Sequence, residues 1–542
     1  MVKKILCACL VACMLLGLAA CGAPNTEPKL EAEQPSEPAT MPEEVAEVAQ
    51  ESENAAVVKT QAGLIEGAFS EDGQVVSFLG VPYAQPPVGE KRWKAPVAVE
   101  PWAGILSCQE FGNSAPQGTM TLEPGTRVMC YGQEYILSGN DPVNEDCLYL
   151  NVWKPSNTQM KDMPVLVIVH GGSFTGGSGR VPVLNGENMA KDGVIVVTIN
   201  YRVGIFGFLA HPELCAEDPN GRSGNYGIMD QIAALQWVRD NIAAFGGDPA
   251  KVTVAGESAG AWSVSLLCQT PETEGLFSQA IAMSGALMDN HGMIPKLSMN
   301  EMAASHQMVL ESVGLNTLEQ LRNASCEELM AVPGFWAPVC DNMIWMEDTQ
   351  ANLRDIPLLL GNNSDEGNIF VAADMTKDQF ADDLKLTYGD MVAEMEAVYC
   401  QEGYTMPEAV FAERRDRYFA YPMYRWVGMH LEKNSAPVYQ YYFSREMPEV
   451  GFGAFHSSEL EYFYNNMAYS DLAWEVTDYG LCKVMTSYLL NFLHTGDPNG
   501  AGLPEWEPYK NQNVMGLGDT VGMISQPHMD AMEAMDRCFA GK

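Results

Sequence analysis

The residues best suited to chemistry surround Ser258, in a pentapeptide at 256–260 that reads Gly-Glu-Ser-Ala-Gly. A short apolar run at 252–255 precedes it, and a helix-compatible segment follows from residue 261. A serine with small neighbours between a strand and a helix is typical of a nucleophile elbow, a strained turn that exposes the serine hydroxyl above a sheet. The pattern occurs once in the chain, and we interpret Ser258 as the nucleophile of an acyl-transfer site.

Acyl transfer also needs hydrogen-bond donors for the oxyanion that develops on the substrate carbonyl. The segment at 170–174, here called the donor loop, reads His-Gly-Gly-Ser-Phe and follows the apolar run at 165–169. Glycines in such a loop let the backbone turn its N–H groups toward a substrate. We predict the backbone N–H groups of Gly172, Ser173 and Ala259 as donors, the last at a helix N-terminus where the dipole is positive.

The base must be a histidine that takes the serine proton, with a carboxylate to orient it. Among the eight histidines, His456 lies in a glycine-containing loop at 451–459, here called the histidine loop, which follows the apolar run at 438–443. His170 lies inside the donor loop, and His430 lies on a helical stretch where a packed or solvated role fits better. The histidines at 211, 291 and 306 precede the expected acid, and those at 494 and 528 have no supporting context. We therefore predict His456 as the base.

The acid should follow a strand between the serine and the histidine, in the chain order serine, acid, histidine. The run at 356–360 leads into a turn at 361–367 that contains both Asp365 and Glu366. The residues themselves favour neither carboxylate.

The elements that must position these groups are short buried strands alternating with helices. Apolar runs of strand length lie at 164–169, 194–199, 252–255, 280–283, 356–360 and 438–443. The segment 226–245 repeats its apolar residues at helical spacing. This alternation favours a parallel sheet covered on both faces, with ligands at the carboxyl ends of its strands. The helix-prone stretches at 291–355 and 370–434 are predicted insertions that form the walls of a gorge above the sheet.

The N-terminus has the layout of an export signal. Lys3 and Lys4 precede an apolar run at 5–16, which is too short for a membrane span, and residues 18–21 read Leu-Ala-Ala-Cys. This tetrapeptide resembles the bacterial lipobox, in which the cysteine becomes a lipid-bearing N-terminus. We predict a signal peptide at 1–20, an acidic disordered tether at 21–56 anchored to a membrane through Cys21, and one folded domain at 57–542.

The composition and net charge exclude some partners and substrates but do not identify a function. A hydrophobic content of 47% is that of an ordinary globular protein, and the net charge of −39 disfavours nucleic acid as a partner. Anionic substrates are repelled at long range by the same charge, so neutral or cationic substrates fit it better, and neutral or apolar esters are the expected class. The segment after the signal contains no Cys-x-x-Cys pair and no cluster at zinc spacing, and neither a metal nor a cofactor is expected.

These motifs together resemble the type-B carboxylesterases, the family that includes cholinesterases. The resemblance extends from residue 57 to about 536, through Phe-Leu-Gly-Val-Pro-Tyr-Ala at 78–84, Glu-Asp-Cys-Leu-Tyr-Leu-Asn-Val at 145–152, the elbow and the histidine loop. It implies an α/β-hydrolase fold, with a large, mostly parallel central sheet, helices on both faces and helical insertions. The expected activity is hydrolysis of carboxylic esters through an acyl-enzyme on Ser258.

The resemblance also assigns supporting roles. It favours Glu366 over Asp365 as the acid. It implies that Glu459, Ser284 and Glu257 support the catalytic residues from positions next to them. The donor loop has Ser173 where the family commonly has a third glycine, which a backbone donor tolerates. Bracing ion pairs are implied for Arg92 with Glu145 and for Arg202 with Asp230.

The chain departs from the family pattern at two points. The early disulfide would use Cys147 with Cys130 or Cys108, and Cys130 is the preferred partner although the spacing matches poorly. The tryptophan that binds choline in cholinesterases would fall near residues 136–138, which read Ile-Leu-Ser, so choline specificity is not expected.

The main alternative from another class is a noncatalytic surface-binding protein of the same fold. Such proteins lack the serine or its partners, whereas this chain has all three and the donors. Amide or thioester hydrolysis would use the same groups and stays open, as do the preferred acyl and alcohol groups and the oligomeric state.

Overall fold

The computed structural model describes residues 55–539 except 124, 289–291, 371–374 and 402. The predicted signal peptide, Cys21 and nearly all of the predicted tether lie outside the described residues. Ala55 and Ala56, at the predicted boundary between tether and domain, are buried in the main hydrophobic core. Within the described residues, no helix combines the length and apolar character that crossing a membrane requires.

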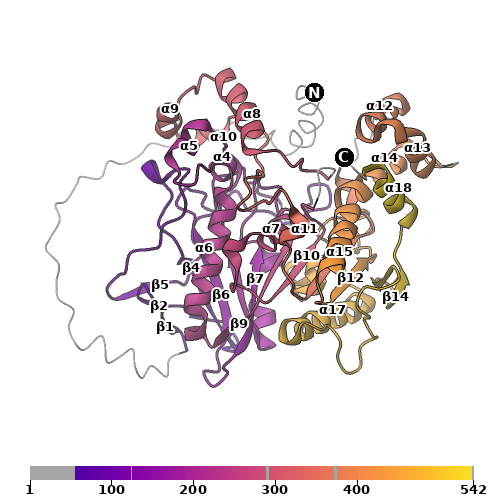
Figure 1. Cartoon of the computed structure of the whole chain (residues 1–542). Helices are drawn as coiled ribbons and strands as arrows, with labels where there is room; N and C mark the ends of the chain where they lie inside the picture. Colours follow the sequence, from indigo (N-terminus) through magenta and orange to yellow (C-terminus); the bar gives the residue numbers. More distant parts are fainter. Residues whose placement is uncertain (1–54, 124, 289–291, 371–374, 402, 540–542) are drawn as a thin grey trace.

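A large sheet of 11 strands forms the centre of the molecule, in the order β14-β13-β12-β11-β10-β9-β7-β8-β6-β4-β3 (Figure 1). Its strands are β3 (Ala68–Phe69), β4 (Val75–Pro82), β6 (Tyr149–Pro155), β7 (Met163–Val169), β8 (Ile195–Ile199), β9 (Gly247–Glu257), β10 (Gln279–Met283), β11 (Leu358–Asn363), β12 (Val438–Phe443), β13 (Asn513–Leu517) and β14 (Val521–Ser525). A smaller sheet contains β1 (Val57–Lys59), β2 (Leu64–Glu66) and β5 (Ile105–Ser107).

In the order of the sheet, the seven neighbouring strands β13, β12, β11, β10, β9, β7 and β8 are parallel to one another. Antiparallel pairs occur only toward the two edges of the described sheet. Each of the six apolar runs in the sequence corresponds to one of these parallel strands. The run at 356–360 is displaced, since β11 begins after Pro357, which has no N–H to give to the ladder. The prediction of a mostly parallel sheet is confirmed.

Two hydrophobic cores cover the two faces of the sheet. Along β7, Val165, Val167 and Val169 belong to one core, while Leu166 and Ile168 belong to the other. This alternation is the period of two that a strand imposes, and it explains why the run has no polar residue. The first core contains side chains of α6 (Tyr226–Asn241) and α7 (Ala259–Leu267). The second contains side chains of α3 (Glu187–Lys191) and α17 (Val476–Thr495).

The two long insertions are helical, as predicted. The first contains α8 (Met299–Ser312), α9 (Leu318–Asn323), α10 (Cys326–Met330) and α11 (Thr349–Asn352); the second contains α12 (Lys377–Tyr388), α13 (Val392–Tyr399), α14 (Met406–Arg415) and α15 (Tyr421–Lys433). Three short helices are α4 (Gly204–Phe208), α5 (Pro212–Glu217) and α16 (Leu460–Phe463), and α18 (Met529–Phe539) follows the last strand. Figure 1 shows α8, α9, α12 and α13 at the top of the view, beyond the strand ends. Helices α12 to α14 share a separate core with α18.

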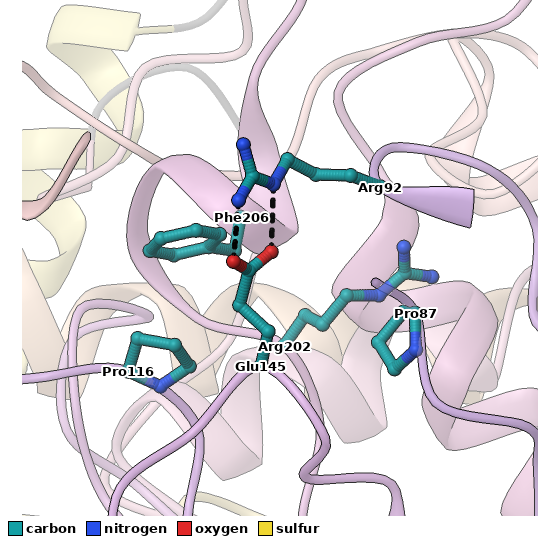
Figure 2. Close-up of a pocket in the computed structure, with 6 residues that line it drawn as sticks. All are labelled: Pro87, Arg92, Pro116, Glu145, Arg202 and Phe206. Carbon is teal, nitrogen blue, oxygen red and sulfur yellow. Dashed lines mark hydrogen bonds and ion pairs between the residues drawn. The ribbon is translucent and has the colours of Figure 1, made fainter. Parts of the chain in front are cut away.

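Both predicted ion pairs are present. Arg92 contacts Glu145 through two N–H donors, one of them at 2.7 Å, as Figure 2 shows. Arg202 donates to both oxygens of Asp230 at 2.7 Å, and both side chains are almost fully buried. The pocket drawn in Figure 2 is lined by the first pair together with Arg202, and its lining includes neither Ser258 nor a residue of the donor loop.

The preferred disulfide between Cys130 and Cys147 is not formed, and this expectation was wrong. Both residues are free, buried thiols, and they belong to different cores, Cys147 to the first and Cys130 to the second. Cys108, the other candidate, is also a free thiol. Burial raises the pKa of the Cys130 thiol to about 12, which leaves it uncharged at neutral pH.

Candidate active site

Ser258 occupies a one-residue turn between β9, which ends at Glu257, and α7, which begins at Ala259. Its backbone has φ 56° and ψ −121°, a strained combination for a residue with a side chain. The Ser258 N–H donates to the Met283 carbonyl at 2.9 Å, and its own carbonyl accepts from Trp262 N–H at 2.9 Å. The turn is thus held from the neighbouring strand and from the helix.

Small residues around the turn allow the backbones to approach. A Cβ built on Gly256 would lie 2.3 Å from the carbonyl carbon of Gly260, and one built on Gly260 would lie 2.1 Å from the Val169 oxygen. Since atoms cannot approach so closely, both glycines are steric requirements of the elbow. They explain the Gly-x-Ser-x-Gly pattern in this chain.

We expect Gly260→Ala to lower the free energy of unfolding by at least about 2 kcal/mol, because the new methyl group must push α7 away from β7. Ester hydrolysis should fall by about 10²-fold, since the serine would move relative to the donor loop. Thermal unfolding and kinetics check both effects. The control is Gly480→Ala in α17, where the Cβ meets nothing within 4 Å and a gain of about 0.5–1 kcal/mol is expected. Equal stability of the two variants would contradict the steric argument.

The donor loop lies directly beside the elbow. A Cβ on Gly171 would be 3.2 Å from the Ser258 Cβ. Gly172 and Ser173 have positive φ values of 107° and 55° and are exposed. Within the described part of the chain, neither of their N–H groups has a hydrogen-bond partner. Together with Ala259, in the first turn of α7 where N–H groups lack intrahelical partners, they provide free donors next to the serine.

His170 supports the donor loop. Its ring stacks on Tyr201, with centroids 4.3 Å apart, and its Nδ1 lies 2.8 Å from the Gly171 oxygen. Burial lowers the pKa of His170 to about 4, so the ring is neutral at ordinary pH. Its contacts are structural, in agreement with its exclusion as the base.

His456 and Glu366 meet across the carboxyl ends of two strands. Glu366 begins the short helical turn η5 (Glu366–Phe370) after β11, and His456 lies in the histidine loop after β12. The His456 Nδ1 is 2.6 Å from Glu366 Oε2, and the other oxygen of Glu366 accepts from Asn363 N–H at 2.8 Å. Both side chains are buried. Asp365 contacts the Ala454 N–H at 3.0 Å instead, so the structure brings Glu366 and not Asp365 to the histidine.

The other edge of the imidazole faces the elbow. His456 Nε2 lies 3.1 Å from Oε1 of Glu257, the residue directly before Ser258. Burial would lower the pKa of His456, but the carboxylates of Glu257 and Glu366 outweigh it and raise the pKa to about 9. The histidine is therefore held between two carboxylates that favour its protonated form.

The remaining predicted partners, Glu459 and Ser284, belong to a buried network. Glu459 accepts from Asn363 Nδ2 at 2.5 Å and from the Tyr441 hydroxyl at 3.2 Å, and Ser284 Oγ lies 3.4 Å from it. Burial raises the pKa of Glu459 to about 8, and the nearby Glu257 adds to this shift. Glu459 and Ser284 thus lie next to each other.

Sequence reasoning missed several residues that contact the histidine loop. The hydroxyls of Tyr131 and Tyr135 donate to the carbonyls of His456 and Ser457, each at 3.2 Å. Phe419 packs on the His456 ring with centroids 4.7 Å apart, from the π-helical turn η7 (Asp416–Ala420). Such turns inside α-helices are frequent at functional sites, but no sequence pattern announces them. Ser457, a residue of the loop itself, could have been singled out from the sequence, because it directly follows the predicted base.

Comparison with known proteins decides the family. The model of the carboxylesterase family matches residues 54–534. The chain belongs to the carboxylesterase family. This match confirms the resemblance and the prediction of an enzyme of the carboxylesterase class.

The carboxylesterase relatives cover most of the chain. It is 34% identical to fumonisin B1 esterase of Sphingopyxis macrogoltabida over 496 residues, which is 85% of this chain and 86% of that protein. It is 34% identical to para-nitrobenzyl esterase of Bacillus subtilis (strain 168), over 84% of this chain and 93% of the relative. A solved structure of PNB esterase superposes with a TM-score of 0.74 at 29% identity and covers 89% of this chain. This likeness confirms the α/β-hydrolase fold.

Proposed function

We propose that this carboxylesterase cleaves carboxylic esters of small molecules through a covalent acyl-enzyme on Ser258. The observation that supports it most is the arrangement at the strand ends: His456 lies between Glu366 at 2.6 Å and Glu257 at 3.1 Å, and Glu257 directly precedes Ser258. The free N–H groups of the donor loop lie beside the same serine. These are the groups that acyl transfer requires.

In the proposed reaction, neutral His456 accepts the Ser258 proton as the serine oxygen attacks the ester carbonyl. The N–H groups of Gly172, Ser173 and Ala259 donate to the oxyanion, and Glu366 orients the imidazole and stabilises its charged form. The histidine then gives its proton to the leaving alcohol. Water activated by the same histidine attacks the acyl-enzyme, the acid leaves, and the serine regains its proton.

Neutral or apolar esters are the proposed substrates. Glu257 and Glu366 are buried beside His456, and the chain carries a net charge of −39. These charges disfavour anionic groups near the serine, at long range and in contact. The named relatives act on esters as different as fumonisin B1 and para-nitrobenzyl esters, so the family resemblance does not fix the acyl or alcohol group.

The test is hydrolysis of p-nitrophenyl acetate and butyrate by the purified full-length protein, followed by a wider panel of neutral, cationic and anionic esters. Turnover of the p-nitrophenyl esters, with anionic esters the poorest substrates, would support the proposal. A folded protein that hydrolyses none of the panel would overturn it and favour the noncatalytic binding alternative.

We further propose that the protein is a bacterial lipoprotein held outside the cytoplasm through Cys21. Support comes from the basic start, the short apolar run and the Leu-Ala-Ala-Cys sequence ending at Cys21. Several acyl chains on one cysteine would anchor the protein stably. Expressed in a bacterial host, the wild type should fractionate with membranes and Cys21→Ser should not. Release of the wild type into the soluble fraction, or equal membrane retention of both proteins, would contradict the anchor.

A further inference from the structure

Ser457 has an unusual backbone for its residue type. It follows His456 directly, is 5% exposed and has φ 79°, in the left-handed region where glycine is usual. A side chain is tolerated there only when the surroundings fix the conformation. The Ser457 carbonyl accepts from the Tyr135 hydroxyl at 3.2 Å, and the preceding carbonyl of His456 accepts from Tyr131. These bonds hold the backbone without using the Ser457 hydroxyl.

The Ser457 hydroxyl has a specific partner. Its Oγ donates to Glu257 Oε1 at 2.7 Å, and this same oxygen lies 3.1 Å from His456 Nε2. Ser458, the next residue, offers a contrast. It is fully buried, and within the described residues its Oγ has no hydrogen-bond partner. The strained backbone thus places the Ser457 hydroxyl, and not the Ser458 hydroxyl, on the carboxylate of Glu257.

Glu257 is poised between its charged and neutral forms. Burial raises its pKa to about 7, while the nearby imidazole of His456 and the hydrogen bond from Ser457 oppose this shift. Other titratable groups around it on neighbouring elements are Glu366, Glu459, Tyr131, Tyr441 and Tyr464. None of these carries a positive charge, so His456 and the Ser457 hydroxyl are what favour ionised Glu257.

We propose that Ser457 is a positioning residue for acyl transfer, whose hydroxyl keeps Glu257 ionised and directed at the Nε2 edge of His456. Two carboxylates, Glu366 on Nδ1 and Glu257 near Nε2, then stabilise the imidazolium that forms when Ser258 gives up its proton. The inference rests on the function proposed above, because it assigns Ser457 a part in that reaction.

The effect should appear in the pH dependence of the reaction. Without the hydroxyl, Glu257 is neutral over a wider pH range, because a hydrogen bond that favours its charged form is lost. His456 then holds its proton less tightly. The neutral base is therefore available at lower pH, and the acid limb of the kcat/KM profile should move down by about one pH unit.

The experiment compares pH profiles of the wild type, Ser457→Ala, Ser457→Gly and Ser458→Ala from pH 5 to 10, with p-nitrophenyl acetate and with Ser258→Ala as the blank for background hydrolysis. The glycine variant removes the hydroxyl at a φ that glycine adopts freely, so it keeps the test valid if the alanine variant folds poorly. Ser458→Ala removes a buried hydroxyl that has no hydrogen-bond partner among the residues that the structure describes.

The proposal expects the limb to shift down in both Ser457 variants and to stay in place in Ser458→Ala. An unshifted limb in the Ser457 variants, or an equal shift in Ser458→Ala, would overturn it while leaving the esterase function intact. Absence of turnover by the wild type would instead overturn the proposed function, and this inference with it.

Discussion

Replacement of Ser258 by alanine should reduce p-nitrophenyl ester hydrolysis by about 10⁵-fold, because the proposed acyl-enzyme forms on the hydroxyl that this variant lacks. The residual rate would come from the donor loop and from substrate binding, which the variant keeps. The fold should survive. Ser258 is held through its backbone N–H and carbonyl, and alanine preserves both of these hydrogen bonds. Steady-state kinetics and thermal unfolding of the purified variant measure the two expectations.

A matched control separates loss of the nucleophile from loss of a buried hydroxyl. Ser458→Ala also deletes a hydroxyl near the base, from a side chain that is fully buried, and it should hydrolyse the ester at close to the wild-type rate at its plateau pH. Retention of more than about 1% of activity in Ser258→Ala would contradict the role of Ser258, since triad serines contribute far more than this.

Glu366→Gln should lower kcat by about 10³–10⁴-fold with little change in KM. Glu366 accepts at His456 Nδ1 at 2.6 Å, and an uncharged amide there neither stabilises the imidazolium nor reliably selects the tautomer with its lone pair on Nε2. Glu366 is fully buried, so we expect substrate binding not to depend on its carboxylate. The kcat and KM values of the variant, measured at the pH of maximal activity, give the result.

Asp365→Asn is the control for this prediction. Asp365 is the adjacent carboxylate, but it accepts from the Ala454 N–H at 3.0 Å, a bond that an asparagine oxygen can also make. Its kcat should stay within about threefold of the wild type, because the asparagine oxygen keeps the bond to the histidine loop. A larger loss in Asp365→Asn than in Glu366→Gln would reverse the assignment of the acid.

The fold follows closely from the sequence where strands are buried on both faces. The run at 194–199 became β8 (Ile195–Ile199), and 438–443 became β12, because continuous apolar residues suit a strand with a core on each side. The strands at the edges of the sheet were harder to predict. Strand β14 is partly exposed and pairs antiparallel with β13, and its short apolar stretch contains Gly522, so it was not among the predicted strands.

The candidate site was predictable to the extent that its residues lie at strand ends. Ser258, Glu366 and His456 follow β9, β11 and β12, and parallel strands bring their carboxyl ends to one edge. Tyr131 could not be found in this way. It contacts the His456 carbonyl across 325 residues of sequence from a segment without helix or strand periodicity. The Cys130–Cys147 expectation failed for a related reason, since spacing does not reveal that the two residues lie in different cores.

The most direct measurement is covalent labelling of the purified full-length protein with a fluorophosphonate, followed by peptide mass mapping. Such a probe reacts with a serine only when a base and oxyanion donors activate it. We predict one label per chain, on the peptide that contains Ser258, with ester hydrolysis lost in proportion to labelling and no label in Ser258→Ala. A folded wild-type protein that takes up no label, or that is labelled on another serine while Ser258→Ala reacts equally well, would contradict the proposed mechanism.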